Sequence, residues 1–448
     1  MSESLFEGIE HRTAKIAVVG IGYVGLPLAV AFARAGFAAV GIDVNSERVA
    51  ALNAGLSYIE DITAADLLTL VQSGRLRATT DYGIIPTCDA LFICVPTPYT
   101  VQHTPDLSFI VQATESIGPY LRAGQLVVLQ STTYPGTTTE IVQPILERVS
   151  GLSARSDFHL AFSPERIDPG NQRWSAYNTP KVVGGLTPEA TAVAAALLRQ
   201  MGAPVHEVSS PAAAELTKLL ENTFRAVNIA LVNEMAQLAE RMEIDFWEVI
   251  EAAKTKPFGF MPFTPGPGVG GHCIPIDPYY LLWKAREYDF YTRFIELAAE
   301  TNETMPYHVV ELVTRGLGLF GKSLHKAQVL VLGVAFKPDI GDSRNSPAER
   351  VIELLMQRGA RVSYHDPFVP RFEVGGNVFH QQCVEMLSVP LTPDQLAGAD
   401  IVVVVTGHHA IDYSRVARYA SLVVDSCNAL QGAEGDAPVI RLGAPFPR

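Results

Sequence analysis

The sequence has few cysteines and no long apolar run, and each absence excludes a class of protein. The five cysteines are scattered and show no CxxC spacing: Cys88, Cys94, Cys273, Cys383 and Cys427. Such a set argues against a disulfide framework and against a zinc site, and it favours the reducing cytoplasm. No apolar stretch reaches the roughly 18 residues that a membrane-spanning helix needs. Residues 1–15 are polar and acidic and lack the apolar core of a signal peptide.

Positive charge is also in short supply. The formal net charge is −13 at pH 7, which disfavours nucleic acid as a partner. It does not exclude a small anionic substrate, because a local pocket can be basic on an acidic protein. Hydrophobic content of 48% with 18% charged residues indicates a globular protein with a large core. A chain of 448 residues has the length of about two to four domains.

The N-terminal region has the pattern of a dinucleotide-binding unit. An apolar run at 15–19 predicts a strand, and 26–35 predicts a helix. Between them lie Gly20, Gly22 and Gly25 in GxGxxG spacing. The first glycine allows a tight turn, the second lets backbone approach a pyrophosphate, and the third permits close helix packing. The alternative is a glycine-rich turn with a structural role alone.

An acidic residue completes this pattern. A second predicted strand, 38–42, ends at Asp43, eighteen residues after Gly25. A carboxylate at this distance is placed to accept hydrogen bonds from the ribose hydroxyls of a dinucleotide. It would repel a 2′-phosphate, so the sequence predicts NAD rather than NADP.

Polar segments follow the next predicted strands, which are 90–95, 126–130 and 157–162. Ligands of open parallel sheets bind at the carboxyl ends of the strands. Thr97, Thr132 and Glu165 come after these strands and are therefore candidate site residues. Ordinary turn or capping chemistry is the alternative for each of them. Residues 181–184 predict an additional edge strand.

The middle of the chain is predicted to be helical. Residues 211–242 contain almost no helix breaker and carry apolar residues at helical spacing. Lys218 and Asn222 are four residues apart on this helix, where they form either a solvated face or an ammonium–amide pair directed at a site. A second long helix is predicted at 291–320, with Pro306 as a possible kink. We expect the long helix to serve as the surface of a homodimer or higher homo-oligomer.

A glycine- and proline-rich loop separates the two long helices. Its fifteen residues, 264–278, include four glycines and four prolines, which exclude a regular helix or a central strand. It carries the thiol of Cys273 and the carboxylate of Asp277. A helix is predicted at 278–287 with Asp277 as its N-cap, so Cys273 would lie where partial positive charge favours a thiolate. The alternative is an inert cysteine buried in a structural turn.

The C-terminal region predicts a second α/β unit without the glycine fingerprint. Its predicted strands are 327–336, 362–365, 401–405 and 422–424. A helix is predicted at 347–358 with Ser346 as N-cap. The polar loop after the first strand contains Lys337, Asp339 and Arg344, which face either a cleft between the two halves or solvent. The predicted fold is α/β, with two Rossmann-like doubly wound domains joined by a central helical domain.

Seven segments in order resemble the UDP-glucose/GDP-mannose dehydrogenase family. They are GIGYVG, VPTP, STTYPGTT, SPER, ELTKLLEN, GVGGHCIPID and GVAFKPDIGDSRNS, and the resemblance runs from about residue 15 to 428. It implies a cytoplasmic enzyme that oxidises the C6 alcohol of a nucleotide sugar to the acid with two NAD molecules and a covalent cysteine intermediate. The implied domains are 1–205 for NAD, 206–320 for the helices and the cysteine loop, and 321–448 for the UDP-sugar.

The resemblance also implies roles for individual residues. The implied catalytic residues are Cys273 as nucleophile, Lys218, Asn222, Asp277, Thr132 and Glu165. The implied NAD-binding residues are Gly20, Gly22, Tyr23, Val24, Gly25, Asp43, Arg48, Thr97, Thr132 and Arg344. The implied substrate-binding residues are Glu165, Arg166, Lys218, Asn222, Gly270 and Lys337. No residue is implied as a metal ligand.

One segment departs from the glucose-specific branch of the family. That branch has a second glutamate four residues after the first, and here the place is taken by Pro169, preceded by Asp168. The segment SPERIDPGN is more similar to the branch that acts on UDP-N-acetylhexosamines, with UDP-GlcNAc favoured, UDP-ManNAc close behind and UDP-glucose still open. A two-electron dehydrogenase of small hydroxy acids and a non-catalytic NAD-dependent binding protein are the remaining alternatives.

Overall fold

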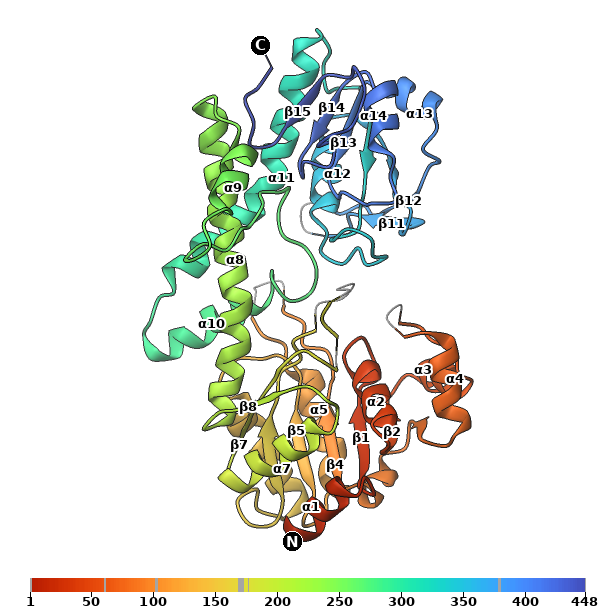
Figure 1. Ribbon diagram of the computed structural model, residues 1–448, viewed down its shortest axis with the longest axis vertical. Coiled ribbons are helices and arrows are strands. Elements are labelled where there is room, and N and C mark those ends of the chain that lie inside the picture. Colours follow the sequence, from red (N-terminus) through yellow and green to blue (C-terminus); the bar gives the residue numbers. More distant parts are fainter. Residues whose placement is uncertain are drawn as a thin grey trace. The chain divides into compact units, whose positions relative to one another are not determined.

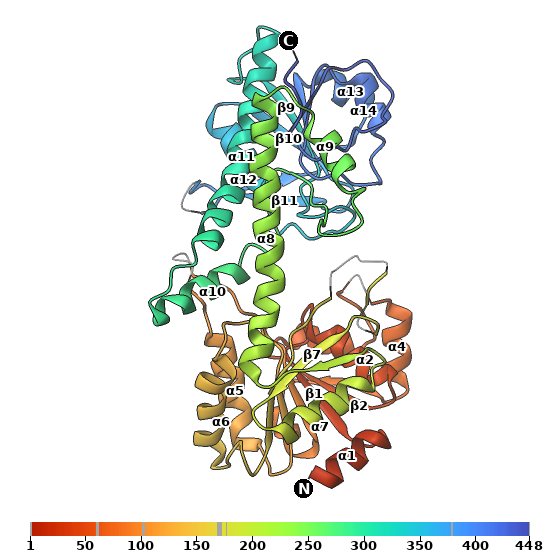
Figure 2. The ribbon, with the colours of Figure 1, turned by 60° about the vertical axis from the view of Figure 1, so that its left-hand side comes forward.

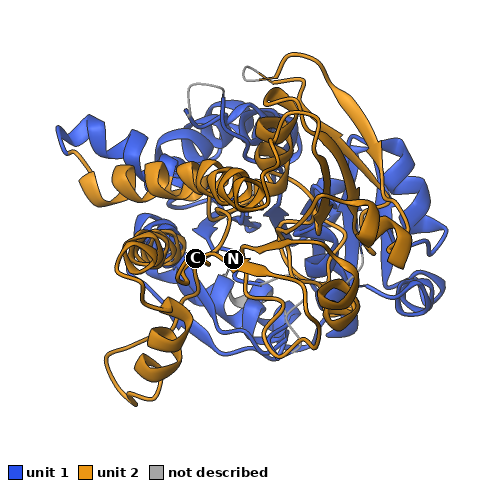
Figure 3. Cartoon of the chain, turned by 90° about the horizontal axis from the view of Figure 1, so that it is seen from above, with its two compact units in different colours: residues 1–221, 279–290 blue, residues 222–278, 291–448 orange. Residues whose placement is uncertain are grey.

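The computed structural model describes residues 2–59, 62–100, 104–167, 173–175, 177–377 and 380–447. The chain forms two compact units, coloured separately in Figure 3. Unit 1 comprises Met1–Glu221 and Tyr279–Phe290, and unit 2 comprises Asn222–Pro278 and Tyr291–Arg448. Asp168 and Pro169, on which the sequence distinguishes two branches, lie outside the described residues.

Unit 1 is built on an eight-stranded sheet in the order β3-β2-β1-β4-β5-β6-β7-β8 (Figure 1). All neighbouring strands are parallel except β6 and β7, which are antiparallel. The strands are β1 Lys15–Val19, β2 Ala38–Ile42, β3 Leu76–Thr79, β4 Ala90–Ile93, β5 Leu126–Leu129, β6 His159–Phe162, β7 Lys181–Gly185 and β8 Val205–Glu207.

Helices cover both faces of this sheet. One core cluster includes side chains of α1, α2, α3, α4 and α7, and a second cluster on the other face includes α5 and α6. These helices are α1 Ser2–Glu10, α2 Gly25–Arg34, α3 Ser46–Asn53, α4 Ala64–Gln72, α5 Ser108–Ile117, α6 Gln143–Ser150 and α7 Pro188–Arg199. A further helix, α10 Asp277–Ala285, belongs to unit 1 from its third residue onward. Shorter helical turns are η1 Tyr82–Thr87, η2 Gly118–Tyr120, the π-helical η3 Thr138–Val142 and η4 Arg286–Tyr288.

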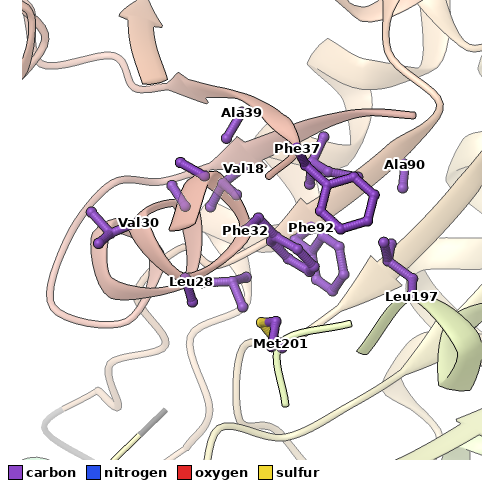
Figure 4. Close-up of a cluster of buried hydrophobic side chains, with 14 of the residues drawn as sticks. Val18, Leu28, Val30, Phe32, Phe37, Ala39, Ala90, Phe92, Leu197 and Met201 are labelled. Carbon is purple, nitrogen blue, oxygen red and sulfur yellow. The ribbon is translucent and has the colours of Figure 1, made fainter. Parts of the chain in front are cut away.

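Phe32 of α2 lies at the centre of the first core cluster (Figure 4). Its ring centroid lies 5.0 Å from that of Phe92 in β4 and 6.0 Å from that of Phe37. Eight of the ten residues of α2 are buried, because small and apolar side chains alternate along it and allow close approach to the sheet. This packing fixes the helix that follows the GxGxxG turn.

Unit 2 contains a five-stranded parallel sheet in the order β10-β9-β13-β14-β15 and an antiparallel β11–β12 pair. The strands are β9 Gln328–Leu332, β10 Arg361–His365, β11 Arg371–Val374, β12 Val384–Leu387, β13 Ile401–Val404, β14 Val423–Asp425 and β15 Val439–Arg441. One core cluster includes residues of α9, α11 and α12, and the other includes α13 and α14. These helices are α9 Phe246–Ala253, α11 Arg293–Leu319, α12 Pro347–Gln357, α13 Pro393–Gly398 and α14 Tyr413–Tyr419.

The long helix α8, Pro211–Arg241, is seen along its length in Figure 2. It contains the boundary between the units at Glu221 and Asn222. Within unit 2 it packs against α11 through buried amides. The side chain of Asn233 donates to Asn302 at 3.0 Å, and Asn302 donates to the Ala226 carbonyl oxygen at 3.1 Å. Pro306 lies inside α11 and is buried. No helix among the described residues has the length and apolarity to cross a membrane.

The predicted α/β architecture is confirmed, and several element boundaries differ. β1 and β2 coincide with the predicted strands, and Ser346 caps α12 by accepting from the Ala348 N–H at 3.2 Å. Residues 181–185 are not an edge strand, because β8 pairs with the outer side of β7. Asp277 is the first residue of α10 rather than its N-cap. The polar N-terminus forms α1, which buries Leu5 and Ile9 in the core of unit 1.

Candidate functional site

The three fingerprint glycines of unit 1 have different surroundings. Gly20 has φ +88°, and a Cβ there would lie 2.7 Å from the carbonyl oxygen of Cys94. A Cβ on Gly25 would lie 1.8 Å from the carbonyl oxygen of Gly20. A Cβ on Gly22 would meet no atom within 4 Å. Two glycines are therefore required by the turn itself, whereas Gly22 leaves the space that a pyrophosphate needs, so the residues present fit NAD.

Asp43 follows β2 and is buried beside this turn. Its carboxylate accepts hydrogen bonds from the backbone N–H of Ile21 at 3.0 Å and of Asn45 at 2.8 Å. The guanidinium of Arg48 lies 3.8 Å from it and is half exposed. Tyr23, next to Gly22, is exposed. The structure therefore brings the predicted NAD-binding residues of the first strand-turn-helix unit together around one turn.

The carboxyl ends of β4 and β5 carry the next two candidates. Thr97 is buried, and its carbonyl oxygen accepts a hydrogen bond from the hydroxyl of Tyr280 in α10. Thr132 is half buried, and the preceding Ser131 donates to the carbonyl oxygen of Val95 at 2.7 Å. The ends of these neighbouring strands are therefore bonded to each other, as expected for the ligand-binding edge of a parallel sheet.

Glu165 follows β6 and bonds to residues of the neighbouring strands at the same edge of the sheet. Its carboxylate forms an ion pair with the ammonium of Lys181 at 2.9 Å and accepts from the side chain of Gln130 at 2.8 Å. Arg166 makes a two-point ion pair with Glu221 of α8, at 2.6 and 3.2 Å, and donates to the carbonyl oxygen of Pro180 at 2.7 Å. This segment thus ties β6 to the helix that carries Lys218.

Helix α8 is anchored to the STTYPGTT segment by Glu215, which the sequence analysis did not single out. Its carboxylate is buried and accepts from the N–H of Gly136 at 2.6 Å, the N–H of Thr138 at 2.9 Å and the Thr138 hydroxyl at 2.6 Å. Burial raises the pKa of Glu215 despite these hydrogen bonds. Lys218, three residues later, is itself buried. The sequence contained a signal for Glu215, because it lies one helical turn before the candidate Lys218 in the ELTK segment.

In unit 2 the cysteine loop ends in a tight turn. The N–H groups of Ile276 and Asp277 donate to the carbonyl oxygen of Cys273 at 3.2 and 2.8 Å. The Cys273 residue is exposed, whereas Asp277 is buried. The side chain of Asn222, also buried, donates to the Asp277 carboxylate at 2.5 Å. The structure therefore brings Asn222, Cys273 and Asp277 together.

The loop after β9 is hydrogen-bonded to the cysteine loop, residues 264–278. The N–H of Gly271 donates to the Arg344 carbonyl oxygen at 3.0 Å, and the Asn345 side chain donates to the Gly271 carbonyl oxygen at 3.0 Å. A Cβ on Gly270 would lie 2.8 Å from both the Asn345 carbonyl oxygen and Cβ of Phe336. Burial, together with the nearby charge of Arg344, lowers the pKa of His272. Glycines 270 and 271 therefore allow the two loops to pack in direct contact.

The three charged candidates of this supporting loop have different surroundings. The Arg344 side chain is paired with Asp342 at 2.6 Å. Asp339 has φ +61° and accepts from the N–H of His409 at 2.8 Å, so it is directed at the loop after β13. Lys337 is half buried. Among the described residues, no group of histidine, cysteine and carboxylate side chains has the arrangement of a metal site.

The candidates thus form two groups, one in each unit. Unit 1 holds the predicted NAD-binding turn together with Thr97, Thr132, Glu165, Arg166 and Lys218, and unit 2 holds Asn222, Gly270, Cys273, Asp277, Lys337 and Arg344. Unit 1 thus combines a dinucleotide cradle with a buried lysine. Unit 2 presents an exposed thiol next to a buried amide–carboxylate pair. This chemistry suits a dehydrogenase that also forms a covalent intermediate.

Three family models match the chain in order. They are the NAD binding domain of the UDP-glucose/GDP-mannose dehydrogenase family over residues 14–202, its central domain over 212–304 and its UDP binding domain over 330–432. The matched segments cover most of the chain. They include the glycine turn, the cysteine loop and the five-stranded sheet apart from β15 and the first two residues of β9.

Individual relatives agree with this assignment. The UDP-N-acetyl-D-glucosamine 6-dehydrogenase of Pseudomonas aeruginosa is 39% identical over 80% of this chain and 84% of its own length. The UDP-N-acetyl-D-mannosamine dehydrogenase of Pyrococcus horikoshii is 36% identical over 88% of this chain and 89% of its own length. A solved UDP-D-ManNAc dehydrogenase from Pyrococcus horikoshii superposes with a TM-score of 0.86 at 32% identity, covering 96% of this chain and 99% of that one. The chain therefore belongs to the UDP-glucose/GDP-mannose dehydrogenase family and is an NAD-dependent UDP-sugar dehydrogenase.

Proposed function

We propose that the protein oxidises the C6 alcohol of a UDP-N-acetylhexosamine, with UDP-GlcNAc favoured, to the uronic acid in a four-electron reaction. The observation that carries this proposal is the exposed Cys273 beside the buried Asn222–Asp277 pair. A single site that removes two hydrides must retain the aldehyde between them, and a thiol retains it covalently. The similarity to a UDP-N-acetyl-D-glucosamine 6-dehydrogenase, at 39% identity, supports the sugar.

The residues around the glycine turn are proposed to hold the cofactor. They are Gly20, Gly22, Tyr23, Val24, Gly25, Asp43, Arg48, Thr97 and Thr132, with Arg344 from unit 2. When bound, NAD supplies the hydride acceptor for both oxidations. The buried Asp43 carboxylate is suited to ribose hydroxyls and opposes a 2′-phosphate.

The remaining residues act on the sugar. Lys218 and Asn222 stabilise negative charge that develops on the C6 oxygen as its proton leaves. The Cys273 sulfur then bonds to C6 of the aldehyde to give a thiohemiacetal, which the second oxidation converts to a thioester. We assign the binding of the nucleotide sugar to Arg166, Gly270 and Lys337.

Hydrolysis of the thioester completes the reaction. The oxygen of a water bonds to C6, the C–S bond breaks, and the Cys273 sulfur leaves as thiolate. Asp277, Thr132 and Glu165 are proposed to assist the attack of this water. The overall conversion removes two hydrides from the sugar and adds one oxygen from water.

The domain roles follow from these assignments. We propose residues 1–205 for NAD, 206–320 for the helices and the cysteine loop, and 321–448 for the UDP-sugar, with a surface polysaccharide or O-antigen precursor as the product's use. UDP-ManNAc is the second candidate sugar, supported by the 36% identity to a UDP-N-acetyl-D-mannosamine dehydrogenase. UDP-glucose is a third candidate sugar, and a two-electron oxidation that releases one NADH per sugar is the alternative to the four-electron reaction.

We also propose that the protein is a homodimer or a higher homo-oligomer. In unit 2, large apolar side chains remain exposed along α8 and just beyond it: Phe224, Leu231, Met235, Leu238 and Met242. Their spacing of seven, four, three and four residues places them along one side of a helix. A row of exposed apolar side chains on a helix is suited to packing against a second copy.

Replacement of the proposed nucleophile tests the function. Cys273→Ser should bind NAD as the unaltered protein does but form no sugar acid, because the hydroxyl of serine is a far weaker nucleophile than a thiolate. Cys383→Ser is the control, since Cys383 is also exposed. Formation of sugar acid by Cys273→Ser at the unaltered rate would remove the covalent mechanism.

A further inference from the structure

A buried ion pair lies at the carboxyl edge of the unit 1 sheet. The side chain of Lys181, the first residue of β7, is 2% exposed, and its ammonium lies 2.9 and 3.0 Å from the two oxygens of Glu165. An ammonium is almost never buried without a partner, because it loses its hydration. Glu165 therefore neutralises a charge that belongs to the core of unit 1.

The Glu165 carboxylate has little capacity left for another partner. One oxygen accepts from the N–H of Arg166 at 2.8 Å, the N–H of Ile167 at 3.1 Å and Lys181. The other oxygen accepts from Gln130 at 2.8 Å and from Lys181. These five hydrogen bonds exceed the roughly four acceptor positions of an ionised carboxylate. To take a proton from water, Glu165 would have to break bonds that hold three strand ends in place.

The charged groups around Glu165 favour its ionised form. Burial raises the pKa of Glu165, but the charge and hydrogen bonds of Lys181 and the N–H groups of Arg166 and Ile167 lower it below its usual value. The guanidinium of Arg166 faces Glu221 of α8. The thiol of Cys94, after β4, lies 3.9 Å from the Gln130 side-chain oxygen, and burial raises its pKa, as does the charge of Glu165.

We propose that Lys181 is a positioning residue that holds Glu165 as a fixed anion, and that the pair braces the ends of β5, β6 and β7 instead of moving a proton. This inference rests on the proposed function and specifies the part that Glu165 has in it. In the hydrolysis step, the proton of the attacking water then passes to Asp277. Glu165 contributes a fixed charge and a fixed position for Arg166.

A double-variant cycle separates this role from that of a general base. Glu165→Gln leaves the ammonium of Lys181 buried without a counter-charge, whereas Glu165→Gln combined with Lys181→Met removes both charges. The amide of Gln130 can turn over to accept from the new glutamine. We expect kcat of the double variant to exceed that of Glu165→Gln by about tenfold, the size of a strong coupling between contacting residues. A double variant as slow as Glu165→Gln would overturn the proposal in favour of a general base.

Thermal unfolding as a function of pH gives a readout that needs no turnover. In the unaltered protein Glu165 stabilises the fold above its unfolded pKa, and this contribution is lost as pH falls through the lowered folded pKa. In Lys181→Met the carboxylate is buried without an ammonium, so its pKa in the folded protein rises. The deficit in Tm relative to the unaltered protein should then be largest at neutral pH and shrink as pH falls.

Two controls define the outcome. The Tm deficit of the double variant should shrink less as pH falls than that of Lys181→Met, because the double variant has no unpaired carboxylate at position 165 and only the pH dependence of the unaltered protein's own ion pair remains in the comparison. Lys284→Met removes another buried lysine of unit 1, but its partners Glu140 and Glu287 are each 48% exposed and can be hydrated, so its Tm deficit should not shrink in the same way. A Lys181→Met deficit that is independent of pH would overturn the proposal.

The two proposals fail in different ways. If the unaltered protein releases no NADH with any UDP-sugar, the proposed function fails while the unfolding comparison still tests the ion pair. If NADH is released and the unfolding deficit does not depend on pH, the function stands and the role of Lys181 is wrong. If Lys181→Met yields no folded protein, the comparison of kcat between the double variant and Glu165→Gln still tests the proposal.

Discussion

At the residue scale, the role of a residue can be predicted from the sequence when the residues that determine it are its neighbours in the chain. The requirement for Gly20 and Gly25 arises within a single turn, and Asn45 caps α3 by accepting from residues two and three positions away. The partners of Glu165 are Gln130 and Lys181, thirty-five residues before it and sixteen after it. Residues so far apart in the sequence form no local pattern that predicts their pairing. The sequence therefore predicts Lys181 only as the first residue of a strand.

The glycine turn yields a paired prediction at this scale. Gly22→Ala should fold normally, because its Cβ meets no atom within 4 Å, but should weaken NAD binding at least about tenfold by filling the approach of the pyrophosphate. Gly25→Ala should lower Tm, because its Cβ would lie 1.8 Å from a carbonyl oxygen. Calorimetric titration with NAD and thermal unfolding check both variants. Unchanged NAD affinity in Gly22→Ala would contradict the assigned cradle.

At the scale of elements, long or strongly apolar segments are predictable and short ones are not. β1, β2, α8 and α12 begin at the residues that the sequence predicts. β3, β8 and β15 have three or four residues each, and so short a run leaves little periodic signal in the sequence. Their places in the sheets depend on pairing with neighbours that are distant in the sequence.

In both sheets, an aspartate after one strand accepts hydrogen bonds from backbone N–H groups after the adjacent strand. In unit 1, Asp43 after β2 accepts from the N–H of Ile21 after β1. In unit 2, Asp366 after β10 accepts from the N–H groups of Val334 and Ala335 after β9 at 2.7 and 3.1 Å. Asp366 also lies 3.0 Å from His408, after β13. The second carboxylate thus joins three strand ends and leaves little capacity for a ribose.

This carboxylate predicts a pH-dependent stability. Burial raises the pKa of Asp366, but hydrogen bonds from His408 and from the N–H groups of Val334 and Phe368 lower it below its usual value. Its contribution is therefore present above the unfolded pKa and is lost as pH falls through the lower folded pKa. Asp366→Asn should lower the free energy of unfolding by roughly 3 kcal/mol at pH 7. The difference in this free energy between the variant and the unaltered protein should narrow below about pH 4.

Denaturant unfolding at several pH values measures this difference. Asp436→Asn is the control, because Asp436 is exposed and its substitution should be nearly neutral. A difference between Asp366→Asn and the unaltered protein that stays constant from pH 7 to pH 3 would show that the carboxylate charge is not responsible.

At the scale of the whole molecule, the order of motifs predicts the family and the α/β architecture. The sequence does not predict that the compact units divide α8 between Glu221 and Asn222, because the helix shows no break there. Nor does it distinguish which apolar positions of α8 remain exposed. Leu219 and Ala226 are buried, whereas Phe224 and Leu231 are exposed, and this depends on which elements pack against the helix.

The exposed row on α8 predicts an assembly. Leu231→Asp combined with Met235→Asp should convert a homodimer to a monomer near the chain mass of 48.5 kDa, because two charges would be buried in the interface. Size-exclusion chromatography with light scattering gives the mass directly. Leu387→Asp, at an exposed leucine of β12, should leave the assembly unchanged. An unaltered mass for the α8 variant would place the interface elsewhere.

The central claim is that Cys273 retains the aldehyde so that one site performs two oxidations. The most direct test is the number of NADH molecules released per UDP-sugar consumed, measured in parallel with UDP-GlcNAc, UDP-ManNAc and UDP-glucose. We predict a ratio near two, with UDP-GlcNAc preferred. A ratio near two with another sugar would keep the mechanism and change the substrate. A ratio near one would contradict the central role of Cys273.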